Sequence, residues 1–588
     1  MANKTEYYIH GVNGPVVKVR GGRTLPRMSL VYVGNQRLFG EVVSSAGEES
    51  IVQIYEDSGG LSAGEPVYPT NEPMSVRLGP GLIGGIFDGI GRPLQAIEER
   101  AGSFISKGIN IESLDEEKLW DVEVLIKEGD ELKPGEFFAR CRESEMTEHR
   151  SMVPPRVSGR AVDVKPSGSY TVVEPIAYVD DGRGSRTPLT LSQRWPVREP
   201  RPFTDRRPID RPLVTGQRVI DTLFPVGKGG CAAIPGPFGA GKTVVQHQLA
   251  KWSDADIIVY LGCGERGNEM TQVLDEFREL KDPRTGRPLM ERTILVANTS
   301  NMPVAAREAS IYTGMTIAEY YRDMGYHVAL MADSTSRWAE ALREISGRLE
   351  EMPAEESFPA YLPSRLAGFY ERAGFVDTLG GAEGSVTVIG AVSPQGGDFS
   401  EPVTQNTQRF VRCFWALDRS LAYARHFPSI NWTTSYTEYF NDLIPWYNEN
   451  FGEDFTQLRV RIMSLLNEES SLMEIVKLIG ADILPDDQKL IIETAKVIRE
   501  GFLQQNAFHP TDTYMKPADQ MSMLRVILRL YDGAKALVAA NIPLRLLTET
   551  GVFAALERMK FDLGGGKSAE YFTELVDNAI ASVRRANA

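Results

Sequence analysis

The sequence predicts an α/β fold in four parts: an N-terminal β-barrel, an inserted β-rich domain, a central parallel sheet with helices on both faces, and a C-terminal helical domain. Three observations predict these parts. Short β-rich runs separated by turns occur near the N-terminus and again after residue 113. From Gly230, apolar strands alternate with helices, and after about residue 440 only helical periodicity remains. The expected domain bounds are 1–75, 76–112 with 196–438, 113–195 and 439–588.

The two β-rich parts have patterns typical of small antiparallel domains. Residues 14–20 and 50–55 are β-rich runs next to glycine turns, which suits a small barrel. Residues 170–177, among other strand-like and proline-rich segments, predict an inserted β-domain. The segment 196–212 is rich in arginine and proline and is typical of a linker. We expect its Arg206, Arg207 and Arg211 to be solvated.

In the central part, strands alternate with helices at the spacing of βαβ units, which predicts a parallel sheet covered on both faces. The predicted strands are 231–234, 257–261, 293–297, 327–332 and 385–391, and the predicted helices are 243–252, 269–280, 304–324 and 336–349. Helical periodicity predicts the C-terminal helices 472–479, 487–505, 520–539 and 568–585.

The composition limits the classes of function. Hydrophobic residues make up 42% and charged residues 24%, which is ordinary for a soluble globular protein. The formal charge of −15 argues against nucleic acid as the main partner, because phosphate backbones need a basic surface. No uncharged apolar stretch is long enough to span a bilayer, and we expect no signal peptide. The cysteines lack metal-binding spacing and are expected to be reduced and mostly buried; they are Cys141, Cys231, Cys263 and Cys413.

The segment Gly236-Pro-Phe-Gly-Ala-Gly-Lys-Thr243 matches the phosphate-loop pattern G-x-x-x-x-G-K-[ST] at every fixed position. It follows an apolar strand and opens a helix, the context in which this pattern binds phosphate. Backbone N–H groups of the loop and the helix N-terminus would face phosphate oxygens. Lys242 would contact the β- and γ-phosphates, and the Thr243 hydroxyl would ligate Mg²⁺.

Two acidic residues lie near the ends of other predicted strands. Asp333 ends the strand 327–332 and is a candidate to hold Mg²⁺ through its water shell, although an aspartate there can also be a helix N-cap. Glu265 follows the strand 257–261 and would orient the attacking water, unless it is a surface residue of a turn. The segments 262–267 and 79–84 both match G-x-G-x-x-G, but the stronger phosphate loop excludes a nicotinamide site.

The chain resembles the catalytic A subunits of prokaryotic V/A-type rotary ATPases over essentially its whole length. The similarity includes the phosphate loop with Phe238, the segments Gly264–Glu269 and Asp333–Glu340, and the stretches 87–94 and 215–225. The inserted β-domain also corresponds to a part of these subunits that F-type β chains lack. The family signature P-x-I-N-W-x-x-S-Y-S occurs as Pro428–Thr437, where the last serine is a threonine.

The resemblance implies a set of site residues and a nucleotide cofactor, ATP or ADP with Mg²⁺. It implies catalytic roles for Lys242, Glu265 and Arg266. It implies nucleotide contacts from Gly236, Pro237, Phe238, Gly239, Ala240, Gly241, Thr243 and Val244, and a purine pocket from Phe427, Gln505, Ala507 and Phe508. The two phenylalanines alternatively pack the junction between domains. Ala240 replaces the phosphate-loop cysteine of eukaryotic relatives.

The resemblance also implies partners and a location. The chain would alternate with B subunits in an A3B3 ring around a central stalk, bind peripheral stalks and act on a membrane-embedded rotor that moves H⁺ or Na⁺, on the cytoplasmic side of a prokaryotic membrane. Related non-catalytic subunits carry an arginine finger where this chain has Glu438, so we expect a partner to supply it, although Arg343 and Arg348 stay open as candidates. The alternatives are a homohexameric motor ATPase of the protein-export or helicase type and a non-catalytic nucleotide-binding subunit.

Overall fold

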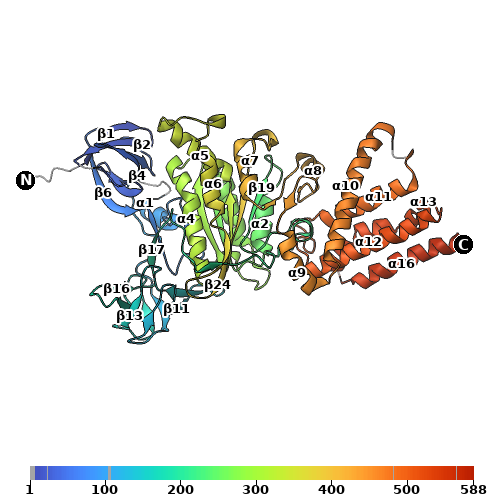
Figure 1. Ribbon diagram of the computed structural model, residues 1–588, viewed down its shortest axis with the longest axis horizontal. Coiled ribbons are helices and arrows are strands. Elements are labelled where there is room, and N and C mark those ends of the chain that lie inside the picture. The colour runs from blue at the N-terminus through green and yellow to red at the C-terminus, as the bar shows by residue number, and fades with distance from the viewer. Residues whose placement is uncertain (1–6, 23, 103–106, 481–482, 565, 588) are drawn as a thin grey trace, which may run out of the picture.

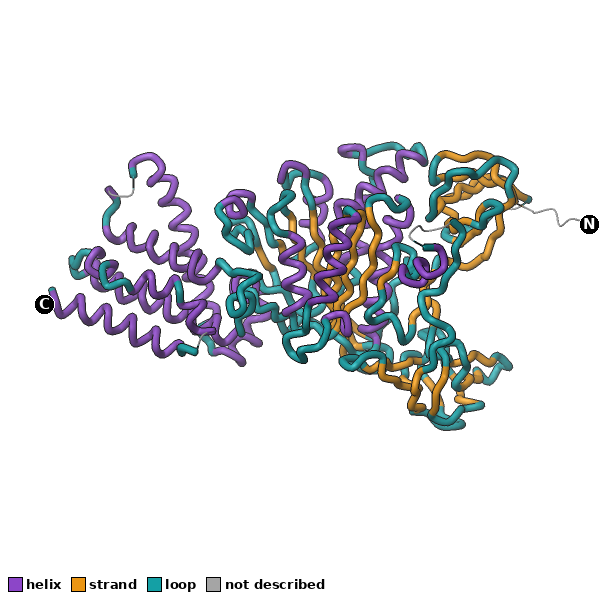
Figure 2. The backbone as a smooth tube through the Cα atoms, turned by 180° about the vertical axis from the view of Figure 1, so that it is seen from behind, coloured by secondary structure: helices purple, strands orange, loops and turns teal. Residues whose placement is uncertain are grey.

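The N-terminal barrel and the C-terminal helices lie at opposite ends of the molecule, with the α/β domain between them (Figure 1). The computed structural model describes residues 7–22, 24–102, 107–480, 483–564 and 566–587. The inserted β-domain projects to one side of the barrel and the α/β domain (Figures 1 and 2). The predicted fold class is confirmed.

The barrel is closed by antiparallel pairing of its six strands. Alternate side chains point inward, as Val17, Val31 and Val52 do, and these three are fully buried. Closure leaves no unpaired edge strand. The strands are β1 (Tyr7–Asn13), β2 (Val16–Gly21), β3 (Ser29–Val33), β4 (Leu38–Ala46), β5 (Glu49–Ile54) and β6 (Pro66–Pro73).

The inserted domain contains two four-stranded sheets, β10-β13-β15-β16 and β12-β11-β9-β14. A two-stranded sheet of β7 (Ser75–Leu78) and β17 (Gln193–Pro196) lies where the insertion leaves and rejoins the chain. His149 is hydrogen-bonded to Tyr320, and the Tyr321 hydroxyl donates to Glu143 at 2.9 Å, so two neighbouring tyrosines hold the insertion. Its strands are β9 (Trp120–Val124), β10 (Glu131–Leu132), β11 (Phe137–Arg142), β12 (Glu148–Met152), β13 (Gly159–Val162), β14 (Gly168–Tyr170), β15 (Ala177–Asp180) and β16 (Arg186–Leu189).

The central sheet has the strand order β26-β25-β19-β24-β22-β20-β21-β8, and its long strands are parallel. Antiparallel pairs were not predicted: β23 pairs with β24 and with β18, and β26 pairs with β25. These additions are two to four residues long, too short for a clear periodicity. The strands are β8 (Ile86–Phe87), β18 (Asp205–Arg206), β19 (Cys231–Pro235), β20 (Ile257–Glu265), β21 (Thr293–Thr299), β22 (His327–Asp333), β23 (Gly374–Asp377), β24 (Glu383–Val392), β25 (Cys413–Phe414) and β26 (Tyr436–Thr437).

Helices cover both faces of this sheet, as predicted (Figures 1 and 2). One apolar core contains residues of α4 (Val304–Asp323), α5 (Thr335–Arg348) and α6 (Leu362–Tyr370). The other contains residues of α2 (Lys242–Trp252) and α3 (Gly267–Glu279) and continues into the C-terminal helices. Three shorter helices complete this part of the chain: α1 (Leu94–Ala101), α7 (Pro402–Phe410) and α8 (Arg419–Tyr423).

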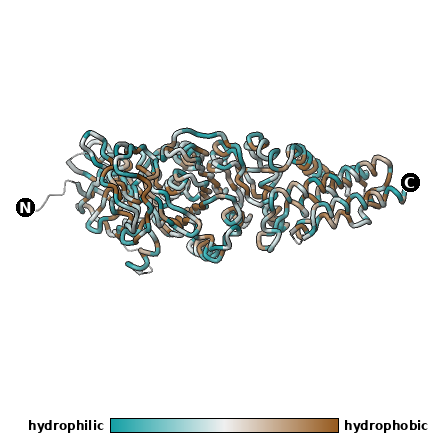
Figure 3. Tube along the Cα trace, turned by 90° about the horizontal axis from the view of Figure 1, so that it is seen from below, coloured by the Kyte–Doolittle hydropathy of each residue, from teal (hydrophilic) through white to brown (hydrophobic). Residues whose placement is uncertain are grey.

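The C-terminal domain is helical and docks on a short π-helix, Val219–Leu223. Tyr447 donates to the carbonyl of Asp221, and Arg459 to that of Leu223. Along its helices hydrophobic and hydrophilic residues alternate (Figure 3), and among the described residues no helix is both long and apolar enough to cross a membrane. The helices are α9 (Phe440–Phe451), α10 (Phe455–Ile479), α11 (Asp486–Lys496), the π-helix Val497–Leu503, α12 (Pro517–Ala539), α13 (Leu544–Thr548), α14 (Val552–Glu557), α15 (Met559–Gly564) and α16 (Ala569–Ala586).

Some sequence predictions needed correction. The helix predicted at 472–479 begins earlier, at Phe455. Its first turns bury Phe455, Leu458, Ile462 and Leu465, which recur at helical spacing, so the prediction stopped short of a periodicity that the sequence carries. The segment 196–212 is more than a linker, since its residues 205–206 form β18 on the central sheet. The three arginines expected to be solvated lie at least partly exposed, but each has a partner: Arg206 donates to the Glu371 carbonyl, and Arg207 and Arg211 form ion pairs with Glu383 and Asp210. All four cysteines are free and buried, as expected.

Candidate nucleotide site

The loop between β19 and α2 encloses the amine of its own lysine. Lys242 Nζ donates to the carbonyl oxygens of Gly236, at 2.6 Å, and Pro237, at 3.2 Å. Gly239 and Gly241 have φ of 80° and 91°, in the left-handed region that favours glycine. The predicted residues from Gly236 through Val244 all lie on this loop or in the first turn of α2. Free N–H groups at the start of α2 make the loop a suitable anion site.

Asp333 lies at the carboxyl end of β22, opposite the start of α2. Its Oδ2 accepts hydrogen bonds from the Thr243 hydroxyl, at 3.2 Å, and from the Tyr260 hydroxyl, at 3.3 Å. Burial raises the pKa of Asp333, while the charge of Lys242 acts in the opposite direction. The structure therefore brings together the two predicted metal ligands, and both offer oxygen atoms of the kind that Mg²⁺ prefers.

Glu265 is the last residue of β20, the strand next to β22 in the sheet. Burial and the charges of Asp333 and Glu269 raise the pKa of Glu265 to about 8, while Arg337 lowers it. Burial lowers the pKa of Lys242, and Asp333 and Glu265 act against that change. Two carboxylates and one lysine thus influence one another at the edge of the sheet beside the phosphate loop.

A cavity of about 600 Å³ adjoins the phosphate loop on the side of the helical domain. It is lined by Gly241 and Val244 of the predicted loop and by all four predicted purine-pocket residues, Phe427, Gln505, Ala507 and Phe508. The side chains of Phe427 and Phe508 are 39% and 87% exposed, so neither is packed into a core. The amide side chain of Gln505 is bonded to Arg218 and Gly216, so Gln505 is held in place by its protein neighbours.

The other predicted residues lie at different places. Arg266 is exposed, and its guanidinium lies 6.0 Å from the centre of the Phe238 ring beside the loop. The guanidinium of Arg343 stacks over the Phe358 ring at 4.7 Å, and Arg348 forms an ion pair with Glu344. Both arginines therefore already have partners within this chain. Glu438 follows β26 on the surface.

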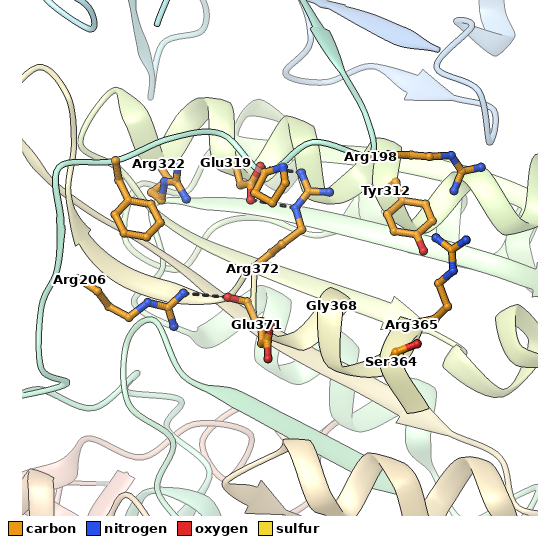
Figure 4. Close-up of a pocket in the computed structure, with 12 residues that line it drawn as sticks. Arg198, Arg206, Tyr312, Glu319, Arg322, Ser364, Arg365, Gly368, Glu371 and Arg372 are labelled. Atoms are coloured by element: carbon orange, nitrogen blue, oxygen red, sulfur yellow. Dashed lines mark hydrogen bonds and ion pairs between the residues drawn. The ribbon is translucent and has the colours of Figure 1, made fainter. Parts of the chain in front are cut away.

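A second cavity of about 600 Å³ lies between the segment 198–206, α4 and α6, and five arginines line it (Figure 4). Three of them are neutralised by buried carboxylates, which leaves little charge for a bound phosphate: Arg372 by Glu319 at 2.6 Å, Arg198 by Glu308 at 2.7 Å and Arg322 by Asp323 at 2.6 Å. Among the described residues, the cavity shares no lining residue with the one beside the phosphate loop. The ion pair of Arg198 with Glu308 holds the segment 198–206 against α4.

Comparison with known proteins agrees with this geometry. Residues 216–437 match the ATP synthase alpha/beta family, nucleotide-binding domain. The other matches are the beta-barrel domain of that family at 9–71, its barrel-sandwich domain at 111–198, and the C-terminal domain of V and A type ATP synthase at 444–545. A V-type ATP synthase alpha chain of Halothermothrix orenii is 58% identical, over 96% of this chain and 98% of that protein. The A subunit of an A-type ATP synthase from Methanopyrus kandleri is 56% identical, over 95% of each chain.

The chain belongs to the family of V-type and A-type ATP synthase alpha chains. The matched central domain is a nucleotide-binding domain, and the relatives are named as one chain or subunit of an ATP synthase. The assembled ATPase EscN of an enteropathogenic E. coli type III secretion system has the same fold, with a TM-score of 0.63 over 89% of this chain, but only 21% identity. Its similarity shows the fold alone.

Several residues around the family's nucleotide domain escaped the sequence analysis. Tyr260 bonds Asp333, the Ser429 hydroxyl donates to the Ala240 carbonyl at 2.7 Å, and Arg337 acts on Glu265. Gln217 and Lys560 line the cavity beside the loop. Arg337, Ser429 and Gln217 lie in the family-like segments, but nothing in those segments indicates their contacts. Tyr260 and Lys560 have no local sequence signal, because each reaches the site only through tertiary contacts.

The pKa of Glu265 makes a prediction for the nucleotide-free chain. The usual pKa of a glutamate is 4.5, and in the folded chain the pKa of Glu265 is about 8. Between these two pH values Glu265 holds a proton in the folded chain and releases it in the unfolded chain. The contribution of Glu265 to stability is therefore lost as the pH rises through this range. Glu265→Gln should be more stable than the parent by a margin that grows from pH 4.5 to about 8 and then stays constant, as measured by urea unfolding. A margin that does not change with pH would contradict the raised pKa.

Phe508 gives a second prediction. Because its side chain is 87% exposed, truncation removes little packing. Phe508→Ala should therefore raise the KM for ATP more than it lowers kcat, since a stacking contact on a base is worth about 1–3 kcal/mol. Leu478→Ala, at a site 85% exposed, is the matched control and should leave KM unchanged. An unchanged KM with a lower Tm for Phe508→Ala would instead indicate a packing role.

Proposed function

We propose that this chain is the catalytic subunit of a V/A-type rotary ATPase or ATP synthase, which couples ATP hydrolysis or synthesis to H⁺ or Na⁺ transport. The proposal rests on one observation. The phosphate loop, Asp333 and Glu265 lie together at one edge of the sheet. A regulatory copy that only binds nucleotide has no need of a half-buried glutamate whose charge acts on that lysine.

In this proposal the phosphates lie on the loop 236–243, and Lys242 exchanges the carbonyls of Gly236 and Pro237 for phosphate oxygens. The adenine lies in the cavity lined by Phe427 and Phe508. The two contacts are made by different domains, since Phe508 belongs to the helical part of the chain. Phe238 and Arg266 would then cover the outer side of the loop.

The residues at the edge of the sheet fit a magnesium ion. The Thr243 hydroxyl and the Asp333 carboxylate are hard oxygen donors 3.2 Å apart. Thr243 would ligate the ion directly and Asp333 through water, and when bound the ion neutralises charge on the phosphates. Tyr260 keeps the carboxylate of Asp333 oriented.

Glu265 would orient and polarise the water that attacks the terminal phosphate. A pKa of about 8 lies close to neutral pH, where a carboxylate both accepts and releases a proton readily. Arg337 favours the charged form of Glu265 and so supports this role.

The partners and location follow from the same proposal. The chain would alternate with B subunits in a hexameric ring, contact central and peripheral stalk subunits, and act on the membrane rotor from the cytoplasmic side without entering the membrane. The position after β26 carries Glu438 where related non-catalytic subunits have an arginine, so the finger would come from the B subunit. The alternative, a homohexameric motor, is favoured only by the fold of EscN at 21% identity.

Two substitutions separate binding from chemistry. Lys242→Ala should weaken ATP binding and abolish turnover, because losing a preorganised charge contact costs about 3–4 kcal/mol of transition-state stabilisation. Glu265→Gln should bind ATP nearly normally and lose about 10²–10⁴-fold in kcat. Nucleotide titration and steady-state ATPase assays on the assembled complex give both quantities. Wild-type turnover in Lys242→Ala, or equal losses of binding and turnover in Glu265→Gln, would refute these roles.

The arginine finger makes a prediction about assembly. The isolated chain should bind nucleotide but turn it over slowly, and adding the B subunit should raise kcat by about 10³–10⁵-fold. Mg·ATP should also promote assembly, because ligand at a shared interface binds the assembled form best. Native mass spectrometry with ATPase assays measures both effects. Full activity of the chain alone, as monomer or homohexamer, would favour the homohexameric alternative.

A further inference from the structure

A buried ion pair joins the nucleotide domain to the helical domain behind the cavity beside the phosphate loop. Arg218 Nη2 lies 2.7 Å from Asp512 Oδ1, and both side chains are completely buried. Arg218 directly precedes the π-helix Val219–Leu223, whereas Asp512 lies between the π-helix Val497–Leu503 and α12. Two charges are retained out of water only when each has its partner in good geometry, so this contact strongly restricts how the two domains meet.

The pair also holds the loop that contributes Phe508 to the cavity. The guanidinium of Arg218 donates to the carbonyl of Gln504 at 2.8 Å and to that of Phe502. The second oxygen of Asp512 accepts from the backbone N–H of Asn506 at 2.8 Å. The ion pair thus bonds the backbone at three positions just before Phe508, and Asn506 in turn accepts from the Phe508 N–H at 3.0 Å.

Gln505 connects the same loop to both walls of the cavity. Its side chain accepts from the Arg218 N–H and donates to the Gly216 carbonyl, both at 2.9 Å, and its backbone N–H donates to the Phe427 carbonyl at 2.7 Å. The loops of Phe427 and Phe508 are therefore tied together. With its side chain 2% exposed, Gln505 contributes by fixing this spacing.

Lys560, on α15, adds two hydrogen bonds to the backbone of the same region. Its amine donates to the carbonyls of Glu500, at 2.6 Å, and Gln504, at 2.9 Å, and it lines the cavity. Burial lowers the pKa of Lys560 to about 8.

We propose that Arg218 and Asp512 are positioning residues for adenine recognition, which hold the loop 504–508 against the nucleotide domain so that Phe508 and Phe427 line one cavity. This inference rests on the proposed function. Within the described part of the chain, the two side chains bond each other and otherwise groups of the helical domain, and neither bonds the phosphate loop. The pair should therefore act on the base and not on the phosphates. Binding of a base in the cavity is thereby linked to the position of the helical domain against the nucleotide domain.

The test compares ATP with inorganic tripolyphosphate, which has the phosphates and lacks the base. Asp512→Asn keeps the size of the side chain and removes the charge. Its affinity for ATP should fall about tenfold or more, the effect of losing one aromatic contact on a base, while its affinity for tripolyphosphate stays unchanged. Calorimetric titration of the folded chain measures both affinities, and KM should rise with little change in kcat in the assembled complex.

Asp323→Asn is the matched control, because Arg201 and Asp323 form a buried pair at 2.6 Å in which Arg201 is completely buried. It should leave both affinities unchanged. Arg218→Lys keeps the charge but loses part of the guanidinium's bonding, and it replaces Asp512→Asn if that variant does not fold. An unchanged ratio of ATP to tripolyphosphate affinity in a folded variant would overturn the inference, whereas an unmodified chain that binds neither ligand would overturn the proposed function.

Discussion

The structure depends on the placement of two acidic groups and one lysine at the carboxyl edge of a parallel sheet. Glu265 ends β20, Asp333 ends β22, and Lys242 begins the helix after β19. Because these strands run parallel, their ends meet at one edge, and the groups influence one another's pKa values. The lysine is bonded to carbonyls of its own loop, and the raised pKa of Glu265 favours the protonated form of this carboxyl group. A neutral Glu265 beside a charged lysine makes this edge of the sheet favourable for an anion.

The rest of the molecule completes a site that this edge cannot form alone. The cavity beside the loop has one wall from the nucleotide domain and one from the helical domain, and the fully buried pair of Arg218 and Asp512 lies between them. A nucleotide would be held by its phosphates on one domain and by its base on the other. Any movement between the two domains would therefore change its contacts. This arrangement gives a physical route by which binding and release of nucleotide could move the helical domain, as a rotary mechanism requires.

Much of this could be predicted from sequence, because the informative patterns are local. The phosphate loop fixes a strand, a turn and a helix within a short segment, and the strand before Asp333 is continuously apolar. The residues that orient these groups could not be predicted. Tyr260 lies in an apolar strand and Ser429 in the family signature, and neither position indicates which backbone or carboxylate its hydroxyl contacts. Arg218 and Asp512 are 294 positions apart. The short antiparallel strands were missed because two to four residues are too few to show a periodicity. The start of α10, by contrast, carries apolar residues at helical spacing and was open to prediction.

A structure of the chain with Mg²⁺ and a non-hydrolysable ATP analogue tests this site most directly. The phosphates should lie on the loop 236–243, with Lys242 Nζ moved from the carbonyls of Gly236 and Pro237 to the terminal phosphate, and the adenine should lie in the cavity lined by Phe427 and Phe508. Phosphates bound elsewhere, or a lysine still bonded to its own loop beside the bound analogue, would contradict this arrangement.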